Sequence, residues 1–342
     1  MISFSSDYIQ GAHEAILDAF IRTNMEQLAG YGDDKYCHSA KQKIAQACGV
    51  SADDVHFLTG GTQTNMVVID AMLRSYEGVV CAQTGHINGH EAGAIEFTGH
   101  KVLTLPEHLG KLDADELRAY LADHYADKNH EHTVRPAMVY ISHPTEYGTL
   151  YTKDELTRIR EVCIEYSMPL FLDGARLGYG LMSSGTDVTL EIIADLCDAF
   201  YIGGTKVGAL FGEAVVITNP ELMKHPVPLI KQHGALMAKG RLLGVQFETL
   251  FTDGLYHEIG RGVVEKAIRL RDAFVAAGYK VEVDSPTNQQ FFRLPNDVVD
   301  RLKENVGFEM WGPRGEKESV VRFVTGWTTT DDEIDQLISY IR

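Results

Sequence analysis

The sequence has little of what marks a disulfide-rich, membrane-spanning or secreted protein. Only five of its 342 residues are cysteines, and no two of them form a CxxC pair. We therefore expect small buried thiols rather than a disulfide framework or a zinc site. No apolar run reaches the length of about 18 residues that a membrane-spanning helix needs. The first ten residues, MISFSSDYIQ, lack a basic stretch followed by an apolar core, so we expect no signal peptide and a cytoplasmic protein.

Positive charge is also in short supply. Lys and Arg total 31 against 48 Asp and Glu, which gives a formal net charge of −17. Nucleic acids and anionic membranes both require a basic face on the protein, so we expect neither as a partner. A local basic pocket for a small anion remains compatible with this balance. The hydrophobic share of 44% is ample for a sizeable core, and the length favours about two domains.

Short apolar runs alternate with helical patterns through most of the chain. The predicted strands are 55–58, 78–82, 101–105, 137–142, 169–173, 199–203 and 214–218. The predicted helices are 62–73, 115–125, 153–167 and 188–196. Thr152 and Glu155 form a capping-box pattern at the start of the third of these helices. Apolar strands separated by helices indicate an α/β fold with a mostly parallel sheet that is covered on both faces.

The pattern changes after about residue 225. Two long helices are predicted over 235–251 and 257–277. Strands at 280–283, 290–294 and 320–325 then mix with helices near 295–304 and after Thr330, which caps the last helix with Glu333. This mixture predicts a smaller α+β domain. We place the boundary near residue 250, with a large domain over 1–250 and a small C-terminal domain over 251–342.

Two motifs that follow predicted strands carry glycine or acidic residues. The segment GGTQTN, residues 60–65, opens a helix, where backbone N–H groups can bind a phosphate. The alternative is a plain strand-to-helix turn capped by Thr62. Asp173, in FLDGAR, closes an apolar strand, where a carboxylate needs a cation or N–H donors. Its alternative is a structural pair with Arg176.

Two more strand ends carry a lysine and a pair of histidines. Lys206 follows Gly203-Gly204-Thr205, and a partly buried lysine has a lowered pKa and can attack an aldehyde. A surface loop lysine is the alternative. His86 and His90 are four residues apart, as metal ligands on a helix can be. No third ligand lies at a suitable spacing, so we predict no metal and favour an aromatic ring that lies on a flat cofactor.

These motifs are expected to meet, because the carboxyl ends of parallel strands lie at one edge of a sheet. A phosphate loop, a carboxylate, a lysine and an aromatic plate are the parts of a pyridoxal 5′-phosphate site. The helix N-terminus binds the phosphate, the carboxylate keeps the pyridine nitrogen protonated, and the lysine forms the Schiff base.

With these motifs in order along nearly the whole chain, the sequence resembles the threonine aldolases. They are pyridoxal-phosphate enzymes of fold-type I in the β-eliminating lyase group. The matching segments are SSD at 5–7, YGDD at 31–34, GTQ at 61–63, His86, DGAR at 173–176, GTK at 204–206 and VVRFVT at 320–325. The resemblance implies an aminotransferase-like architecture and a homotetramer built as a dimer of dimers. It also implies cleavage of threonine, allo-threonine or a related β-hydroxy-α-amino acid to glycine and an aldehyde.

The resemblance also implies roles at the cofactor. Lys206 would be the Schiff-base lysine, and Asp173 would pair with the pyridinium nitrogen. His86 would stack on the ring. Gly61 and Thr62 would hold the phosphate.

Further implied roles concern the substrate and the subunit interface. Arg176 and Arg322, with Ser6, would hold the substrate carboxylate or the phenolic oxygen of the cofactor. Lys239 would reach a phosphate, that of a neighbouring subunit, with a solvated helix face as its alternative.

The general base is where this chain departs from some members of the family. They carry a second histidine in the loop after strand 137–142, where this chain has Glu146. The candidates are His86, or a water held by Glu146 and His90. We favour His86 as both stacking ring and base, because an imidazole pKa near 6.5 suits proton abstraction at neutral pH. Two other functions remain open: β-elimination by another pyridoxal-phosphate lyase, and a catalytically silent binding protein on the same fold.

Overall fold

The computed structural model describes residues 1–341, and a seven-stranded sheet forms its centre. The strand order is β2-β8-β7-β6-β5-β3-β4. The strands are β2 (Val55–Leu58), β3 (Glu77–Ala82), β4 (Lys101–Leu105), β5 (Arg135–Ser142), β6 (Leu170–Asp173), β7 (Ala199–Gly203) and β8 (Glu213–Ile217). They run parallel except β8, which is antiparallel to both of its neighbours. The predicted mostly parallel sheet is confirmed.

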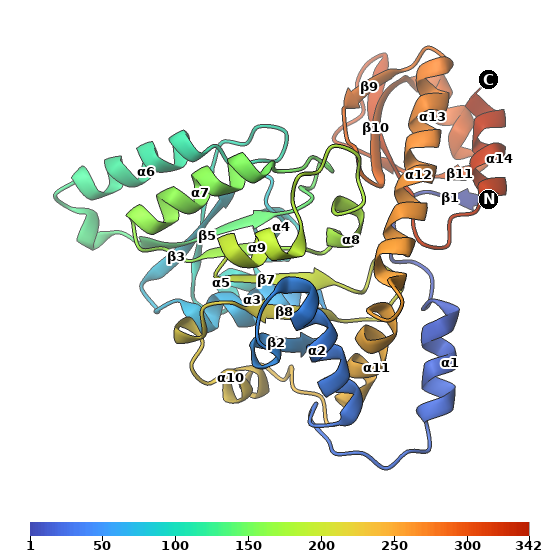
Figure 1. Cartoon of the computed structure of the whole chain (residues 1–342). Helices are drawn as coiled ribbons and strands as arrows, with labels where there is room; N and C mark the ends of the chain where they lie inside the picture. Colours follow the sequence, from blue (N-terminus) through green and yellow to red (C-terminus); the bar gives the residue numbers. More distant parts are fainter. Residues whose placement is uncertain (342) are drawn as a thin grey trace.

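Helices cover both faces of this sheet, as Figure 1 shows. On one face lie α2 (Lys35–Cys48), α6 (Ala114–Ala126), α7 (Lys153–Glu165) and α9 (Leu190–Leu196). On the other lie α3 (Gly61–Met72), α5 (Ala94–Phe97) and α10 (Pro226–Gln232). Successive strand residues enter opposite cores: Ile141 packs with the first set of helices and Tyr140 with the second. The inner strands β3, β5, β6, β7 and β8 are buried on both faces and are mostly continuous apolar runs in the sequence. The edge strands β2 and β4 are only partly buried.

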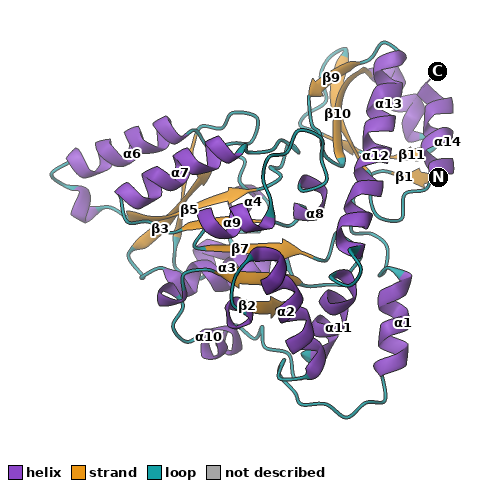
Figure 2. Cartoon of the chain, in the orientation of Figure 1, coloured by secondary structure: helices purple, strands orange, loops and turns teal. Residues whose placement is uncertain are grey.

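The C-terminal part of the chain builds a second, antiparallel sheet, drawn in orange at the upper right of Figure 2. Its order is β12-β13-β10-β9. The elements are β9 (Lys280–Val283), β10 (Gln289–Pro295), β12 (Glu309–Met310), β13 (Glu318–Val324), α13 (Asn296–Lys303) and α14 (Asp331–Ile341). The long helix α12 (Leu255–Ala276) runs from the large sheet to this smaller domain.

The N-terminal segment and the last helix, α14, lie close together in this smaller domain (Figure 1). Strand β1 (Ile2–Ser3) pairs in parallel with β11 (Val306–Gly307). Phe4 joins the same apolar cluster as the residues of β10, β13 and α14. The boundary near residue 250 stays a prediction, and the first residues of the chain pack with its C-terminal part.

The remaining elements connect these layers. They are α1 (Glu14–Thr23), α4 (His86–Gly89), α8 (Leu177–Gly180), α11 (Arg241–Leu250) and the short 3₁₀ helices η1 (Ala52–Asp54), η2 (His130–His132) and η3 (Pro220–Leu222). No helix within residues 1–341 is both long and apolar enough to span a bilayer. All five cysteines are buried and free.

The helix predicted over 235–251 is wrong in its first turns, because α11 begins only at Arg241. The backbone before it bonds elsewhere: the Ala238 carbonyl accepts a hydrogen bond from the Tyr31 amide at 3.1 Å. A Cβ on Gly240 would lie 2.4 Å from the Gly32 nitrogen. This segment is therefore committed to the 31–32 loop and is not available for helical hydrogen bonds.

A glycine in α11 sets how closely that helix packs on α2. A Cβ at Gly244 would lie 2.5 Å from the backbone nitrogen of Cys37, whereas one at Gly262 in α12 would meet only Lys266 Nζ, at 4.0 Å. We expect Gly244→Ala to lower the free energy of unfolding by about 1–3 kcal/mol through overpacking. Gly262→Ala, the matched control, should raise it by up to about 1 kcal/mol, because alanine favours a helix. Urea unfolding of both variants checks this, and equal effects would contradict it.

Candidate active site

A cavity of about 270 Å³ lies beside the carboxyl ends of the central strands. Its lining residues come from the loops after β3, β5, β6 and β7, from the N-terminal segment and from the small domain: Tyr8, His86, His90, Glu146, Arg176, Lys206, Glu309, Trp311 and Arg322. Five of these are predicted site residues, namely His86, Glu146, Arg176, Lys206 and Arg322. The first four meet because parallel strands present the loops at their carboxyl ends on one edge. Arg322 comes instead from β13 of the small sheet.

Asp173, at the end of β6, lies beneath this cavity with only 4% of its surface exposed. Its carboxylate accepts hydrogen bonds from Tyr140 Oη (2.6 Å), Tyr201 Oη (2.5 Å), Asn65 Nδ2 (3.1 Å) and the Ala175 amide (3.0 Å). Burial by itself raises the pKa of Asp173, but the nearby His86 and these donors outweigh burial and lower it. Asp173 is therefore an ionised carboxylate inside the protein.

His86 begins α4 and is held from its Nδ1 side. This nitrogen lies 2.8 Å from Glu91 Oε1, and the same oxygen accepts a hydrogen bond from Asn65 Nδ2 at 2.8 Å. Because a carboxylate only accepts, Nδ1 carries the hydrogen and Nε2 is left as the acceptor. Asn65 also donates to Asp173, so one amide connects the histidine's carboxylate to the carboxylate beneath the cavity.

The second histidine, His90, lies close to the first, with ring centroids 5.5 Å apart. Burial, together with the charges of His86 and Arg322, lowers the pKa of His90. Within residues 1–341 no three His, Cys, Asp or Glu side chains come together in a way that could hold a metal ion.

Lys206 is half-buried in the turn after β7. Burial lowers its pKa, and the positive charge of Arg176 lowers it further. The carboxylate of Glu213 holds this turn, accepting from the Gly204 amide (3.2 Å) and Thr205 Oγ1 (2.8 Å). Burial raises the pKa of Glu213 to about 8. Sequence reasoning missed Glu213; its one signal is an acidic residue at the edge of an apolar run, GEAVVI.

The two arginines of the cavity have different partners. Arg176 does not pair with Asp173; its Nε and Nη2 donate to the two oxygens of Asp7, at 2.8 and 3.1 Å. Arg322 donates through Nη1 to Gln289 Oε1 at 2.9 Å and through Nη2 to Glu309, and its Nε is buried without a partner among the described residues. Asp7 and Glu309 are thus two acidic residues at the site that the sequence did not reveal as partners.

Glu146 lines the cavity from the loop after β5. Its Oε1 accepts a hydrogen bond from Ser142 Oγ at 2.7 Å, and burial raises its pKa. Tyr8 and Trp311, both missed by sequence reasoning, complete the walls. Lys206 Nζ lies 5.8 Å from the centroid of the Tyr8 ring, and the Arg322 guanidinium 5.0 Å from that of Trp311.

Besides Asp173, three other groups of predicted residues do not line this cavity. Gly61 and Thr62 begin α3, whose N-terminus has no side-chain cap. Ser6 has a buried hydroxyl without a partner among the described residues. Lys239 lines a different hollow, of about 500 Å³, with Arg241 and the 26–30 segment. Within this chain, Lys239 is therefore not part of the cavity.

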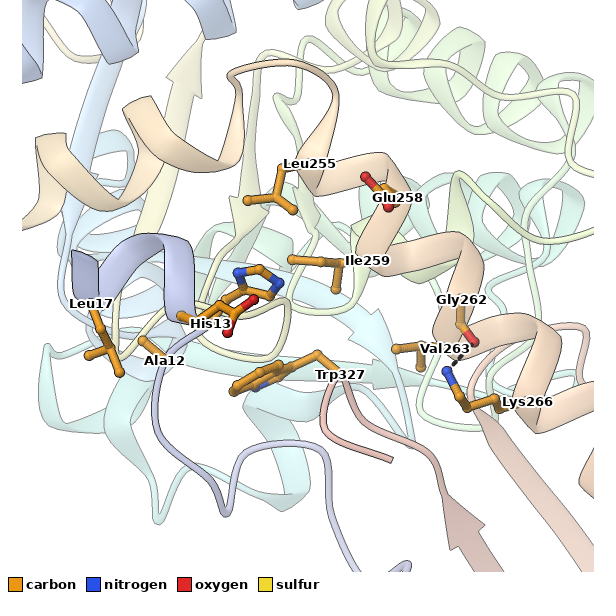
Figure 3. Close-up of a pocket in the computed structure, with 11 residues that line it drawn as sticks. Ala12, His13, Leu17, Leu255, Glu258, Ile259, Gly262, Val263, Lys266 and Trp327 are labelled. Carbon is orange, nitrogen blue, oxygen red and sulfur yellow. Dashed lines mark hydrogen bonds between the residues drawn. The ribbon is translucent and has the colours of Figure 1, made fainter. Parts of the chain in front are cut away.

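A further hollow of about 500 Å³ lies between the start of α1 and α12 (Figure 3). His13, Ile259 and Trp327 are among its lining residues. No predicted site residue lines it, so we assign the chemistry to the smaller cavity at the strand edge.

The chain is similar to known proteins over nearly its whole length. Residues 3–294 match the family described as β-eliminating lyase. A low specificity L-threonine aldolase of Pseudomonas sp. (strain NCIMB 10558) is 29% identical, covering 99% of this chain and 96% of that protein. A solved structure of a Leishmania major threonine aldolase has a TM-score of 0.96 at 43% identity, covering 100% of this chain and 98% of that one. Aspartate aminotransferase of Thermus thermophilus, with maleate, has a TM-score of 0.71 at 16% identity, covering 99% and 90%; it shows the fold alone.

The hydrogen bonds to Asp173 give a stability prediction. Tyr201→Phe removes a donor from a buried carboxylate, which should cost about 1.5–3 kcal/mol of unfolding free energy at pH 7. Tyr256→Phe is the control, because Tyr256 donates to a neutral carbonyl, that of Gly203, at 3.0 Å; it should cost about 0.5–1.5 kcal/mol.

The pH dependence separates the two variants. The native pKa of Asp173 is lowered, so its stabilisation is fully present above the unfolded pKa of about 3.9 and is lost as the pH falls from there through the lower native pKa. Denaturant unfolding from pH 7 to about pH 2.5 should show the Tyr201→Phe penalty shrinking at the acidic end and the Tyr256→Phe penalty constant. A Tyr201→Phe penalty that does not change with pH would contradict an ionised Asp173.

Proposed function

This chain belongs to the β-eliminating lyase family and within it to the threonine aldolases, and from that premise we propose that it cleaves β-hydroxy-α-amino acids with pyridoxal 5′-phosphate. It is accordingly a carbon–carbon lyase of amino acid metabolism. Threonine or allo-threonine would give glycine and acetaldehyde. The observation that carries the proposal is one cavity that gathers an amine of lowered pKa, an ionised buried carboxylate beneath it and two guanidinium groups.

The residues present fit the cofactor. Lys206 offers the amine for covalent attachment, and its lowered pKa leaves more of it unprotonated. Asp173 offers a negative charge for the ring nitrogen, and His86 a ring for stacking. The uncapped N-terminus of α3, at Gly61 and Thr62, offers backbone N–H groups for the phosphate. When bound, pyridoxal phosphate supplies the electron sink for cleavage of the Cα–Cβ bond.

The arginines would bind the substrate carboxylate. Arg322 has its Nε buried without a partner among the described residues, and Arg176 keeps Nη1 after Asp7 has taken its other two nitrogens. The hydroxyl of Ser6, next to Asp7 in the sequence, is buried without a partner among the described residues and is the third proposed ligand. A guanidinium matches a carboxylate better than an ammonium does, because two parallel N–H groups can bind it.

We propose His86 as the base that takes the β-hydroxyl proton. Glu91 fixes its Nδ1 as the donor, so Nε2 is the basic atom. Glu146 has the raised pKa that a carboxylate base would need, but Ser142 already occupies its Oε1. Glu146 is therefore assigned to orient the hydroxyl or a water.

Lys239 and the oligomer belong to the same proposal. Lys239 lies outside the cavity of its own chain, which supports a role at the phosphate of a neighbouring subunit. We propose a homotetramer arranged as a dimer of dimers, in the cytoplasm, acting on a small amino acid.

The products decide the reaction. Purified protein loaded with pyridoxal phosphate should convert threonine isomers and phenylserine to glycine and the corresponding aldehyde. Lys206→Ala should retain cofactor but lose turnover by orders of magnitude, and borohydride should fix the cofactor to Lys206 in the parent protein. Peptide mapping and product analysis test both. Pyruvate and ammonia from cysteine or serine, without glycine from threonine, would indicate β-elimination instead.

Two substitutions separate the candidate bases. His86→Phe keeps an aromatic plate and removes the ring nitrogens, so kcat should fall by about 10²–10⁴, the usual size of general base catalysis, while cofactor affinity changes little. Glu146→Gln keeps the acceptor for Ser142 and should cost less than tenfold in kcat, on the order of one lost hydrogen bond. Steady-state kinetics with threonine measures both. Near-normal kcat in His86→Phe together with a large loss in Glu146→Gln would place the base at Glu146.

A further inference from the structure

The two arginines that face the cavity are neutralised by carboxylates held in very different ways. Asp7, the partner of Arg176, has a side chain that is 0% exposed. It also accepts a hydrogen bond from Asn288 Nδ2 at 2.8 Å. Its pKa is lowered, because the charges of Arg176 and Lys206 outweigh the effect of burial. With two bonds to Arg176 and one to Asn288, this carboxylate is a fixed part of the site.

Glu309, the partner of Arg322, is held by much less. Its side chain is 46% exposed, against 12% for that of Arg322. Its carboxylate reaches one nitrogen of the guanidinium, Nη2, and makes no second hydrogen bond with a described residue. It belongs to β12, a two-residue strand at the edge of the small sheet. The strand register places Glu309 directly opposite Arg322, so the contact is a cross-strand pair.

The nitrogen that Glu309 takes is the one a substrate carboxylate needs. A guanidinium can bind a carboxylate side-on, through Nε and Nη2, or end-on, through Nη1 and Nη2. Both modes use Nη2, and Gln289 already occupies Nη1. Nε is buried without a partner among residues 1–341. On the side-on edge of Arg322, Nε therefore has no partner and Nη2 is bound by Glu309. On the same edge of Arg176, both Nε and Nη2 are bound by Asp7.

We propose that Glu309 is a displaceable counter-ion that covers the substrate-carboxylate site on Arg322 and gives way when an α-amino acid binds. This inference rests on the proposed function in one respect, that the ligand carries an α-carboxylate. Burial and the charge of Arg176 both disfavour the charged form of Arg322, so the empty site needs a carboxylate there. When substrate arrives, one carboxylate replaces another, and the charge paired with Arg322 is unchanged. Glu309, already half exposed, turns to water.

The exchange has a consequence for recognition. Each ligand that uses Arg322 must compete with Glu309, so the affinity for carboxylate ligands is lower than the arginine alone would give. An amine without a carboxylate leaves the Arg322–Glu309 pair in place and meets no such competition. Glu309 is thus a positioning residue, which acts on substrate affinity through Arg322 and not on the bond-breaking step.

Glu309→Gln tests this with two ligands of the cofactor-loaded protein. Glycine carries the carboxylate and 2-aminoethanol lacks it. The dissociation constant of glycine should fall about two- to fivefold, the size expected for one exposed ion pair, and that of 2-aminoethanol should stay unchanged. Calorimetry or the absorbance of the bound cofactor measures both without turnover. For threonine, KM should fall by the same factor and kcat should stay within about twofold. Glu309 competes with the substrate only in the free enzyme, so its loss changes binding and leaves kcat unchanged.

Glu282→Gln is the matched control. Glu282 pairs with Arg293 in the same small sheet, at 2.9 and 2.5 Å, away from the cavity. It should change neither ligand's affinity. Unchanged or weaker glycine binding in Glu309→Gln, or an equal gain for both ligands, would overturn the inference. A glycine gain in a protein that cleaves no threonine would instead leave the inference standing and refute the proposed function.

Discussion

A carboxylate buried at a strand end needs hydrogen-bond donors from several parts of the chain, and Asp173 has four such donors. Tyr140 reaches it from β5, Tyr201 from β7, Asn65 from α3 and the Ala175 amide from its own loop. An unpaired charge at this depth would cost several kcal/mol. The central strands, α3 and the loop after β6 must therefore lie as they do for the carboxylate to stay ionised. These same elements form the side of the cavity nearest Asp173.

The walls of the cavity depend on a second set of charges that joins the ends of the chain. Asp7 lies near the N-terminus, Arg176 in the middle, and Asn288 in the small domain. The same small domain supplies Arg322, Glu309 and Trp311. Strand β1 pairs with β11, which places the N-terminal segment beside those residues. The site is thus closed by parts of the sequence that are far apart. Arg176 pairs with Asp7 from the N-terminal segment, and Arg322 pairs with Glu309 from the small domain.

The sequence predicts local features well and long-range partners poorly, for physical reasons. Strand β7 is buried on both faces, is an apolar run and matches its predicted bounds. The partly buried strands β2, β4 and β9 also match theirs. Helix α2 was missed because its buried residues are mostly Ala and Cys, which give a weak helical pattern. The convergence of His86, Glu146, Arg176 and Lys206 follows from the topology of a parallel sheet. The choice of Asp7 over Asp173 as the partner of Arg176 does not, since 169 residues separate the pair.

Asn65 shows how little freedom the arrangement leaves. Its single amide nitrogen donates one hydrogen to Glu91 and the other to Asp173. Since a carboxylate can only accept, both hydrogens are committed and the orientation of the amide is fixed. Its oxygen is consequently buried without a partner among the described residues, an unfavourable position that the two charge-assisted bonds offset. Through this side chain the proposed base, His86 with Glu91, and the carboxylate assigned to the ring nitrogen are held in one rigid relation. The sequence predicts a functional role only for the N-terminal end of α3, at the phosphate. Through Asn65, α3 therefore also sets the distance between His86 and Asp173, the two groups that the proposed reaction requires.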